Sequence, residues 1–302
     1  MSSRWRAPWK TSWRDVPDPV DRPGAAIDPR HARRRFERAA PGYADASRLE
    51  SEIGARMLER LDYVRLAPHR ILDAGAGPMR DARALVKRYR DAEVIALDYS
   101  GAMLRAGRRR FGFLERRAPE PLCADFARLP LASGAVELLW SNMALHWAAD
   151  PPAALREFHR VIAVGGLLMF STLGPDTLAE LRAAAGAARV HAFADMHDLG
   201  DMLVAAGFAE PVMDMERLTI EYAGGEALLA DLRASGQTSA LAGRARGLAG
   251  RRFRAALGEQ LAAQRRGGKL PVTFEVVYGH AWKAAPRRAA DGRAIVQFER
   301  HR

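Results

Sequence analysis

The sequence is poor in cysteine and in long apolar runs. Cys123 is the only cysteine among 302 residues, which excludes an internal disulfide and a cysteine-rich metal site. No apolar run approaches the roughly 20 residues that a helix needs to cross a bilayer. No charged-then-apolar signal segment opens the chain. We therefore expect a globular protein of the cytoplasm, without a membrane span.

Lysine is also scarce, so nearly all of the net charge of +11 comes from arginine. A basic surface favours anionic partners. However, no zinc finger, recognition helix or aromatic RNA-binding motif accompanies the charge. We expect no nucleic-acid binding and keep an acidic protein partner open. No cluster of histidines and carboxylates has the spacing of metal ligands, so we expect no metal.

The most informative stretch is 70–110, which reads as strand, glycine turn, helix, strand and helix. Gly75 and Gly77 let the backbone turn tightly and approach a ligand. Pro78 suits the first turn of the following helix. About twenty residues beyond the glycines, the second strand ends in Asp98, where an acid can hold a ribose diol. An ordinary strand-to-helix turn is the alternative for any isolated Gly-x-Gly.

The same stretch discriminates between adenosine cofactors. A dinucleotide fingerprint needs glycine or alanine where this chain has Arg80, so NAD is disfavoured. Asp73 stands two places before the first glycine. This arrangement resembles the S-adenosylmethionine pocket of class I methyltransferases, in which such an acid lies near the methionyl amino group. The third glycine usual in that pocket is replaced by Met79.

Further candidates follow the other strands. By the same resemblance, Asp125 accepts the adenine amino group and Phe126 covers the ring, although a helix cap is an equal alternative for Asp125. Polar and aromatic side chains after the strand 136–140 should line the reacting centre, since ligands of open α/β sheets bind beyond the carboxyl ends of strands. We assign cofactor binding to Asp73, Gly75, Gly77, Asp98, Tyr99, Met103, Asp125, Phe126 and Asn142.

Strands and helices alternate four or five times, which specifies a parallel, doubly wound sheet. The alternating segment 272–282 predicts a last, antiparallel strand. The expected class is therefore α/β, a Rossmann-like seven-stranded sheet with an inserted helical region. We divide the chain into a tail (1–30), a methyltransferase domain (31–223, with cap helices at 31–61), an inserted basic helical region (224–268), the last strand (269–285) and a C-terminal tail (286–302).

Several motifs together resemble the malonyl-acyl carrier protein O-methyltransferases of biotin biosynthesis. The resemblance covers about 31–283. It lies in FERAAPGYADASRL, LDAGAGP, ALDYSGAML and LPLASGAVELLWSNMALHW, and more specifically in STLGPDTLAELR, LLADLRASGQTSAL and LPVTFEVVYGHAW. It implies methylation, by S-adenosylmethionine, of the free carboxylate of a malonyl thioester on an acidic acyl carrier protein.

The resemblance also implies substrate residues. An arginine should form a two-pronged contact with the malonyl carboxylate, and Arg182 is the first choice and Arg233 the second. We further assign substrate positioning to Tyr43, Asn142, His146 and Trp147, of which Tyr43 and Trp147 close over the methyl group. No general base is needed, since a carboxylate is ionised at pH 7. The arginine run 244–266 could dock the carrier protein, and we expect a monomer.

Alternatives diverge beyond Gly174. A methyltransferase for a quinone or another small carboxylic acid would share everything before that point. A methyltransferase-like assembly factor that hydroxylates an arginine in a respiratory complex carries a similar TL-x-ELR stretch. A cofactor-binding scaffold without catalysis draws its support from Met79 alone. Each predicts cofactor binding without a methylated malonyl thioester.

Overall fold

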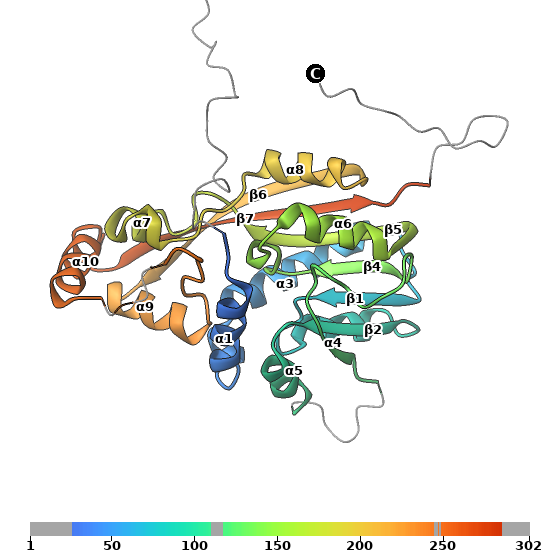
Figure 1. Cartoon of the computed structure of the whole chain (residues 1–302), viewed down its shortest axis with the longest axis horizontal. Helices are drawn as coiled ribbons and strands as arrows, with labels where there is room; N and C mark the ends of the chain where they lie inside the picture. Colours follow the sequence, from blue (N-terminus) through green and yellow to red (C-terminus); the bar gives the residue numbers. More distant parts are fainter. Residues whose placement is uncertain (1–25, 110–116, 245–246, 248, 286–302) are drawn as a thin grey trace, which may run out of the picture.

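A seven-stranded sheet forms the centre of the computed structural model (Figure 1), which describes residues 26–109, 117–244, 247 and 249–285. Its strands are β1 (Arg70–Ala74), β2 (Glu93–Asp98), β3 (Glu120–Cys123), β4 (Val136–Ser141), β5 (Ile162–Leu173), β6 (Ala209–Tyr222) and β7 (Leu270–Trp282). They lie in the order β3-β2-β1-β4-β5-β7-β6, with β7 antiparallel to both of its neighbours. The predicted fold class and the antiparallel last strand are confirmed.

The helices fall into three groups. Those that connect the strands are α4 (Arg80–Arg88), α5 (Gly101–Arg108), α6 (Pro151–Val161) and α8 (Met196–Ala205). Those that precede β1 are α1 (Pro29–Ala39), α2 (Tyr43–Ala46) and α3 (Arg48–Arg60). Those near the far ends of β6 and β7 are α7 (Ala179–Ala185), α9 (Gly225–Ala234) and α10 (Arg251–Ala263). Sequence reasoning assigned no helix to α7. The two tails lie outside the described residues, except for 26–30.

Side chains alternate between the two faces of the sheet, as the period of a strand requires. Leu72, Leu139 and Phe170 belong to a core cluster that also holds residues of α6 and α8. Ile71 and Leu138 belong to a second cluster, which holds residues of α3 and α4. Both faces are therefore covered by helices, as expected for a mainly parallel sheet.

The inserted helices have a core of their own. Leu228 of α9 and Leu261 of α10 are buried together with Leu270, Val272 and Phe274 of β7. Figure 1 shows α7, α9 and α10 gathered at one end of the long β6–β7 pair, beyond the edge of the shorter strands. A second, smaller layer of helices thus stands beside the carboxyl ends of the strands.

The turn after β1 differs from the prediction in one respect. Pro78 was expected in the first turn of the helix, but α4 begins at Arg80. The delay follows from two residues in the left-handed region, Gly77 at φ +52° and Met79 at φ +59°. Met79 thus occupies the place where glycine is usual, at a conformation that costs a side-chain-bearing residue about 1–2 kcal/mol. Its side chain is fully buried and packs against Gly107 of α5, which offsets that cost.

This balance predicts the order of stability of two variants. Met79→Ala and Met79→Gly both lose the buried side chain, at about 2–5 kcal/mol. Glycine adopts the left-handed conformation without steric strain. The free energy of unfolding of the glycine variant should therefore exceed that of the alanine variant by about 1 kcal/mol, and it should unfold at a higher urea concentration. Equilibrium denaturation measures both. An alanine variant at least as stable as the glycine variant would show that the backbone at this position carries no strain.

Candidate active site

One cavity lies at the carboxyl ends of β1, β2 and β4. This is the point at which the strand order reverses, because β2 and β3 lie on one side of β1 and β4 lies on the other. Gly75 is required for close approach here, because a Cβ at this residue would lie 2.3 Å from Cβ of Ala144. Two predicted substrate residues, Tyr43 and Trp147, line this cavity. All nine predicted cofactor residues line it as well, namely Asp73, Gly75, Gly77, Asp98, Tyr99, Met103, Asp125, Phe126 and Asn142.

Asp73 brings an unpaired carboxylate oxygen to this cavity. The residue is 1% exposed, and its Oδ2 has no hydrogen-bond partner among the described residues. Burial, followed by the nearby carboxylates of Asp81 and Asp98, raises the Asp73 pKa well above its ordinary value. A cation placed beside Oδ2 would supply the missing partner and favour the charged form. The wall therefore fits a ligand that carries an ammonium group.

Asp98, at the end of β2, organises the glycine turn that follows β1. Its Oδ2 accepts a hydrogen bond from the Gly77 backbone N–H at 2.8 Å, and its Oδ1 accepts one from Ser100 N–H at 2.7 Å. Burial raises the Asp98 pKa to about 6, against the lowering effect of these two bonds. The remaining acceptor capacity of the carboxylate can receive hydroxyl donors of a ribose diol.

The other end of the cavity is aromatic. Phe126 is buried and its ring centroid lies 5.9 Å from that of Phe158. Asp125 accepts a hydrogen bond from Ala127 N–H at 2.9 Å through Oδ1 and so caps a turn, whereas the alternative of a helix cap is wrong, because no helix lies between β3 and β4 in the described residues. Its Oδ2 atom is not used by that bond. Tyr99 lies under the Arg33 guanidinium, whose Cζ is 5.1 Å from the ring centroid.

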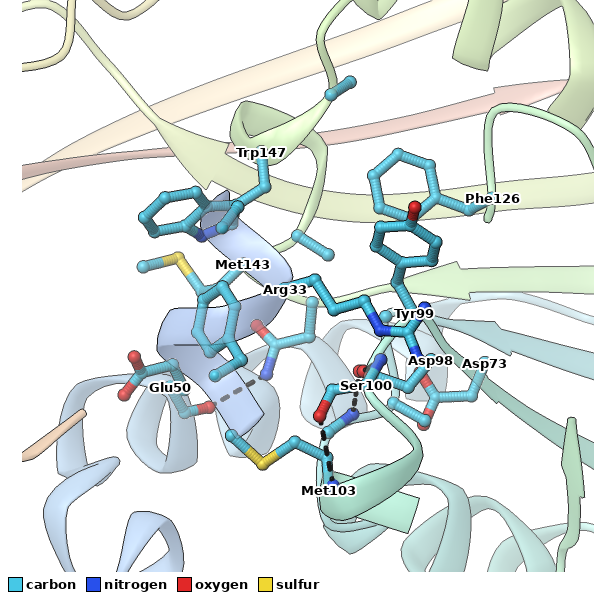
Figure 2. Close-up of a pocket in the computed structure, with 18 of the residues that line it drawn as sticks. Arg33, Glu50, Asp73, Asp98, Tyr99, Ser100, Met103, Phe126, Met143 and Trp147 are labelled. Carbon is cyan, nitrogen blue, oxygen red and sulfur yellow. Dashed lines mark hydrogen bonds between the residues drawn. The ribbon is translucent and has the colours of Figure 1, made fainter. Parts of the chain in front are cut away.

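The helices before β1 cover the cavity. The Phe36 ring of α1 lies edge-on to Trp147, with centroids 5.0 Å apart, and edge-on to Tyr43, at 6.2 Å. Figure 2 shows Trp147 and Phe126 on one side of the pocket and Met103 on the opposite side. Phe36 and Arg33 were not predicted as site residues. Their helical pattern alone did not reveal which strand ends α1 would cover.

Asn142 lines the pocket, yet its amide is already engaged by protein groups. Its Nδ2 donates to the Glu50 carbonyl oxygen at 2.8 Å and to Asp81 Oδ2 at 2.7 Å, and its Oδ1 accepts from Ser171 Oγ at 2.7 Å. Asp81, on α4, was missed by sequence reasoning, since an acid in the first turn of a helix is common. In this structure Asn142 fixes the loop after β4, and direct ligand contact stays a prediction.

A second cavity adjoins the first at Trp147, which lines both. His146 lines the second cavity and is half-buried, and its Nε2 atom is buried without a hydrogen-bond partner among the described residues. Burial lowers the His146 pKa to about 3, so the ring is neutral at pH 7. Thr238 and Ser239 also line this cavity, and their hydroxyl oxygens are buried without partners among the described residues. Three unpaired groups that can donate hydrogen bonds therefore meet there.

The predicted arginines have different positions. Arg233 lines the second cavity. Arg182 does not line either cavity; its Nη2 donates to the carbonyl oxygens of Thr177, at 3.0 Å, and His191, at 3.3 Å. Arg189, which was not predicted, lines the second cavity and stacks 3.9 Å from the centroid of the Phe253 ring. The role of Arg182 and Arg233 on a carboxylate stays a prediction.

Glu50 connects the two cavities. It lines the first, whereas Gln237, whose Nε2 donates to Glu50 Oε1, lines the second. Glu50 is 6% exposed, and its burial raises its pKa to about 7. Figure 2 places Glu50 across the pocket from Asp73. This link ties α3 to the segment that carries Thr238 and Ser239.

Comparison with known proteins assigns the class. Residues 72–170 match the family model described as a methyltransferase domain. Among solved structures, the YcgJ protein of Bacillus subtilis superposes with a TM-score of 0.58 at 16% identity, over 76% of this chain and 99% of that one. Phosphoethanolamine N-methyltransferase 2 of Haemonchus contortus, in complex with S-adenosyl-L-methionine, superposes with a TM-score of 0.51 at 14% identity, over 77% and 52%. The fold is that of the class I S-adenosylmethionine-dependent methyltransferases.

Curated relatives narrow the class to one family. The chain is 49% identical to the malonyl-acyl carrier protein O-methyltransferase of Gallionella capsiferriformans, over 90% of this chain and 96% of that protein. It is 50% identical to the enzyme of the same name from Laribacter hongkongensis, over 91% and 97%. The chain belongs to the malonyl-acyl carrier protein O-methyltransferase family.

Two absences concern the described residues alone. None of the helices in that part of the chain has the length and apolar character to cross a membrane. Within the same residues, no group of three or more histidine, cysteine, aspartate or glutamate side chains is arranged to hold a metal ion.

The buried Glu50 carboxyl predicts a pH-dependent effect on stability. Its folded pKa of about 7 lies above the ordinary value of 4.5, so the folded state loses stability as pH rises from about 4.5 to 7. Glu50→Gln keeps the acceptor for Gln237 and removes this loss. The variant should be about 2–3 kcal/mol more stable than wild type at pH 8, with little gain at pH 5.

Glu52→Gln is the matched control, since Glu52 lies on the same helix and is exposed. Urea denaturation at the two pH values measures both variants. An equal change in the free energy of unfolding of Glu50→Gln at pH 5 and pH 8 would contradict a buried, pH-sensitive carboxyl.

Proposed function

We propose that this protein uses S-adenosylmethionine to methylate the free carboxylate of a malonyl thioester carried by an acyl carrier protein. Its membership of the family supports the reaction. The structural observation that carries it is the junction at Trp147, where a cavity with an unpaired carboxylate meets a cavity with unpaired hydrogen-bond donors. The first suits a cationic cofactor and the second an anionic acceptor.

The first cavity would hold the cofactor through four groups. Asp73 Oδ2 receives the methionyl ammonium group, Asp98 receives the ribose diol, Asp125 receives the adenine amino group and Phe126 covers the ring. When bound, the cofactor supplies an electrophilic methyl group on a sulfonium ion. Tyr43 and Trp147, joined through the edge of Phe36, exclude water from the reacting end.

The second cavity would hold the acceptor. A carboxylate is ionised at pH 7, so it needs placement and desolvation and no general base. Neutral His146 and the hydroxyls of Thr238 and Ser239 can donate hydrogen bonds to it, and Arg233 adds a positive charge. Held there, one carboxylate oxygen would be placed to accept the methyl group, and the electron pair of the C–S bond would stay on sulfur. The products are a methyl ester and S-adenosylhomocysteine.

The methyl ester has a purpose in chain elongation. Esterification removes the distal negative charge, so enzymes with apolar acyl pockets can extend the disguised chain toward a pimeloyl group for biotin. Acyl carrier proteins are acidic and cytoplasmic, and the run 244–266 offers exposed arginines for docking, including Arg251 of α10. A monomeric state remains our expectation.

The Asp73 carboxylate predicts a selective loss of cofactor affinity. Asp73→Asn keeps the shape and removes the charge that pairs with the ammonium group. S-adenosylmethionine should bind about ten- to a hundredfold more weakly, as expected for the loss of a charged hydrogen bond. Isothermal calorimetry measures this. Methylthioadenosine, which lacks the amino-acid part, should bind equally to variant and wild type. Equal losses for both ligands would mean that the substitution disturbs the whole pocket.

The reaction itself predicts a mass change. Incubation with S-adenosylmethionine should add one methyl group, about 14 Da, to malonyl-acyl carrier protein and none to acetyl-acyl carrier protein, because only the former has a free carboxylate. Mass spectrometry of the intact carrier proteins measures both. A protein that binds the cofactor but leaves the malonyl carrier unchanged would favour the assembly-factor alternative. Methylation of free small acids alone would favour a small-molecule methyltransferase.

A further inference from the structure

A third cavity adjoins the second between α9 and α10. Its lining comes from these two helices and from the residues next to them. It shares four residues with the second cavity, namely Leu229, Arg233, Phe253 and Leu257. The two cavities are therefore neighbours across one wall, and Trp147 lies at the far side of the second cavity, beside the cofactor pocket.

The spacing of the lining residues along α9 and α10 shows how the two helices leave space for the third cavity. Gly225, Leu229 and Arg233 stand four residues apart and so share one face of α9. On α10, Phe253, Leu257 and Leu261 repeat the same spacing. The helices meet closely at one end, where a Cβ on Gly225 would lie 2.7 Å from Leu261 Cδ1. The shared lining residues are one and two turns away from that contact.

The three cavities form a series from α9 and α10 to the cofactor pocket, because neighbouring cavities share lining residues, and we call this series the passage. Figure 1 shows α9 and α10 on the outside of the molecule, away from α4 and α5. The third cavity lies between these two helices, and the second cavity extends from the shared lining residues to Trp147. A substrate attached to a large carrier needs such a passage, because the carrier itself cannot enter the cavity between Tyr43 and Trp147.

The chemistry of the passage changes along its length. Leu229, Phe253 and Leu257 make the shared lining mainly apolar around Arg233, whereas the third cavity adds Arg254 and Arg265 and has one acid, Glu226, among its described lining residues. Arg265 already donates to the Gly268 carbonyl oxygen at 3.0 Å through Nε. Arg254 is exposed on α10 next to Phe253. A cation at this mouth suits a phosphate, and an apolar interior suits an uncharged chain.

We propose that the passage between α9 and α10 admits the phosphopantetheine arm of the carrier protein, and that Arg254 binds the phosphodiester of that arm at the mouth. This inference rests on the proposed function. The arm places its thioester in the second cavity, and the malonyl carboxylate reaches the methyl group beside Trp147. The site that binds the arm is thus separate from the site at which the acidic surface of the carrier protein docks.

Small thioesters separate the phosphate from the carrier protein. Malonyl-4′-phosphopantetheine and malonyl-pantetheine differ only in the phosphate, and methyl transfer to each is followed by mass spectrometry under steady-state conditions. The wild-type protein should show a KM about tenfold lower for the phosphorylated thioester, with the same kcat. Arg254→Ala should remove this preference. Arg252→Ala, an equally exposed arginine that does not line the cavity, should retain it.

A wild-type protein with equal KM for both thioesters would overturn the proposal, and so would an Arg254→Ala variant that keeps the full preference. A loss of preference in both variants would also overturn it, because general surface charge would then account for phosphate binding. Failure of the proposed function looks different, since the wild-type protein would methylate neither thioester, nor malonyl-acyl carrier protein.

Discussion

The site depends on a buried carboxylate that joins elements far apart in the sequence. Asp81 of α4 accepts hydrogen bonds from Asn142 Nδ2, after β4, and from Arg80 Nε, at 2.7 and 3.0 Å. Arg80 and Asn142 both donate in turn to the Glu50 carbonyl oxygen, at 2.7 and 2.8 Å. Removing one member of such a network would leave other buried polar groups unpaired, which is costly. The network therefore fixes α3, α4 and the loop after β4 as one frame around the cofactor cavity.

From this frame the coupling extends to the acceptor side. Glu50 receives the Gln237 amide, and Gln237 precedes the two residues whose unpaired hydroxyls line the second cavity. Displacement of α3 would therefore move the hydroxyl groups of Thr238 and Ser239 together with the helices that cover the first cavity. Methyl transfer requires this kind of rigidity, because the carboxylate oxygen and the methyl carbon must be held in line and away from water. Placement of the substrate, rather than proton transfer, is then the main task of the protein.

The inserted helices show how a common fold acquires a particular substrate. Proteins with low sequence identity share the sheet, so the fold by itself does not determine the substrate. The apolar cluster on the extended β6–β7 pair positions α9 and α10 beside the strand ends. Their facing side chains create a second cavity and its approach from solvent. The proposed acceptor cavity is thus lined mainly by residues outside the sheet.

Sequence alone determined the local features of this protein. The alternation of strands and helices and the motifs beyond Gly174 predicted the fold and the family, because these depend on neighbours along the chain. The same local patterns named cofactor residues that the structure brings to the wall of one cavity, and their contact with the cofactor stays a prediction. Only the tertiary structure revealed Glu50, Asp81 and the hydroxyls at 238 and 239. Their roles arise from contacts between residues that are tens to nearly two hundred positions apart. It also placed Arg182 against backbone carbonyls, which no local pattern specifies.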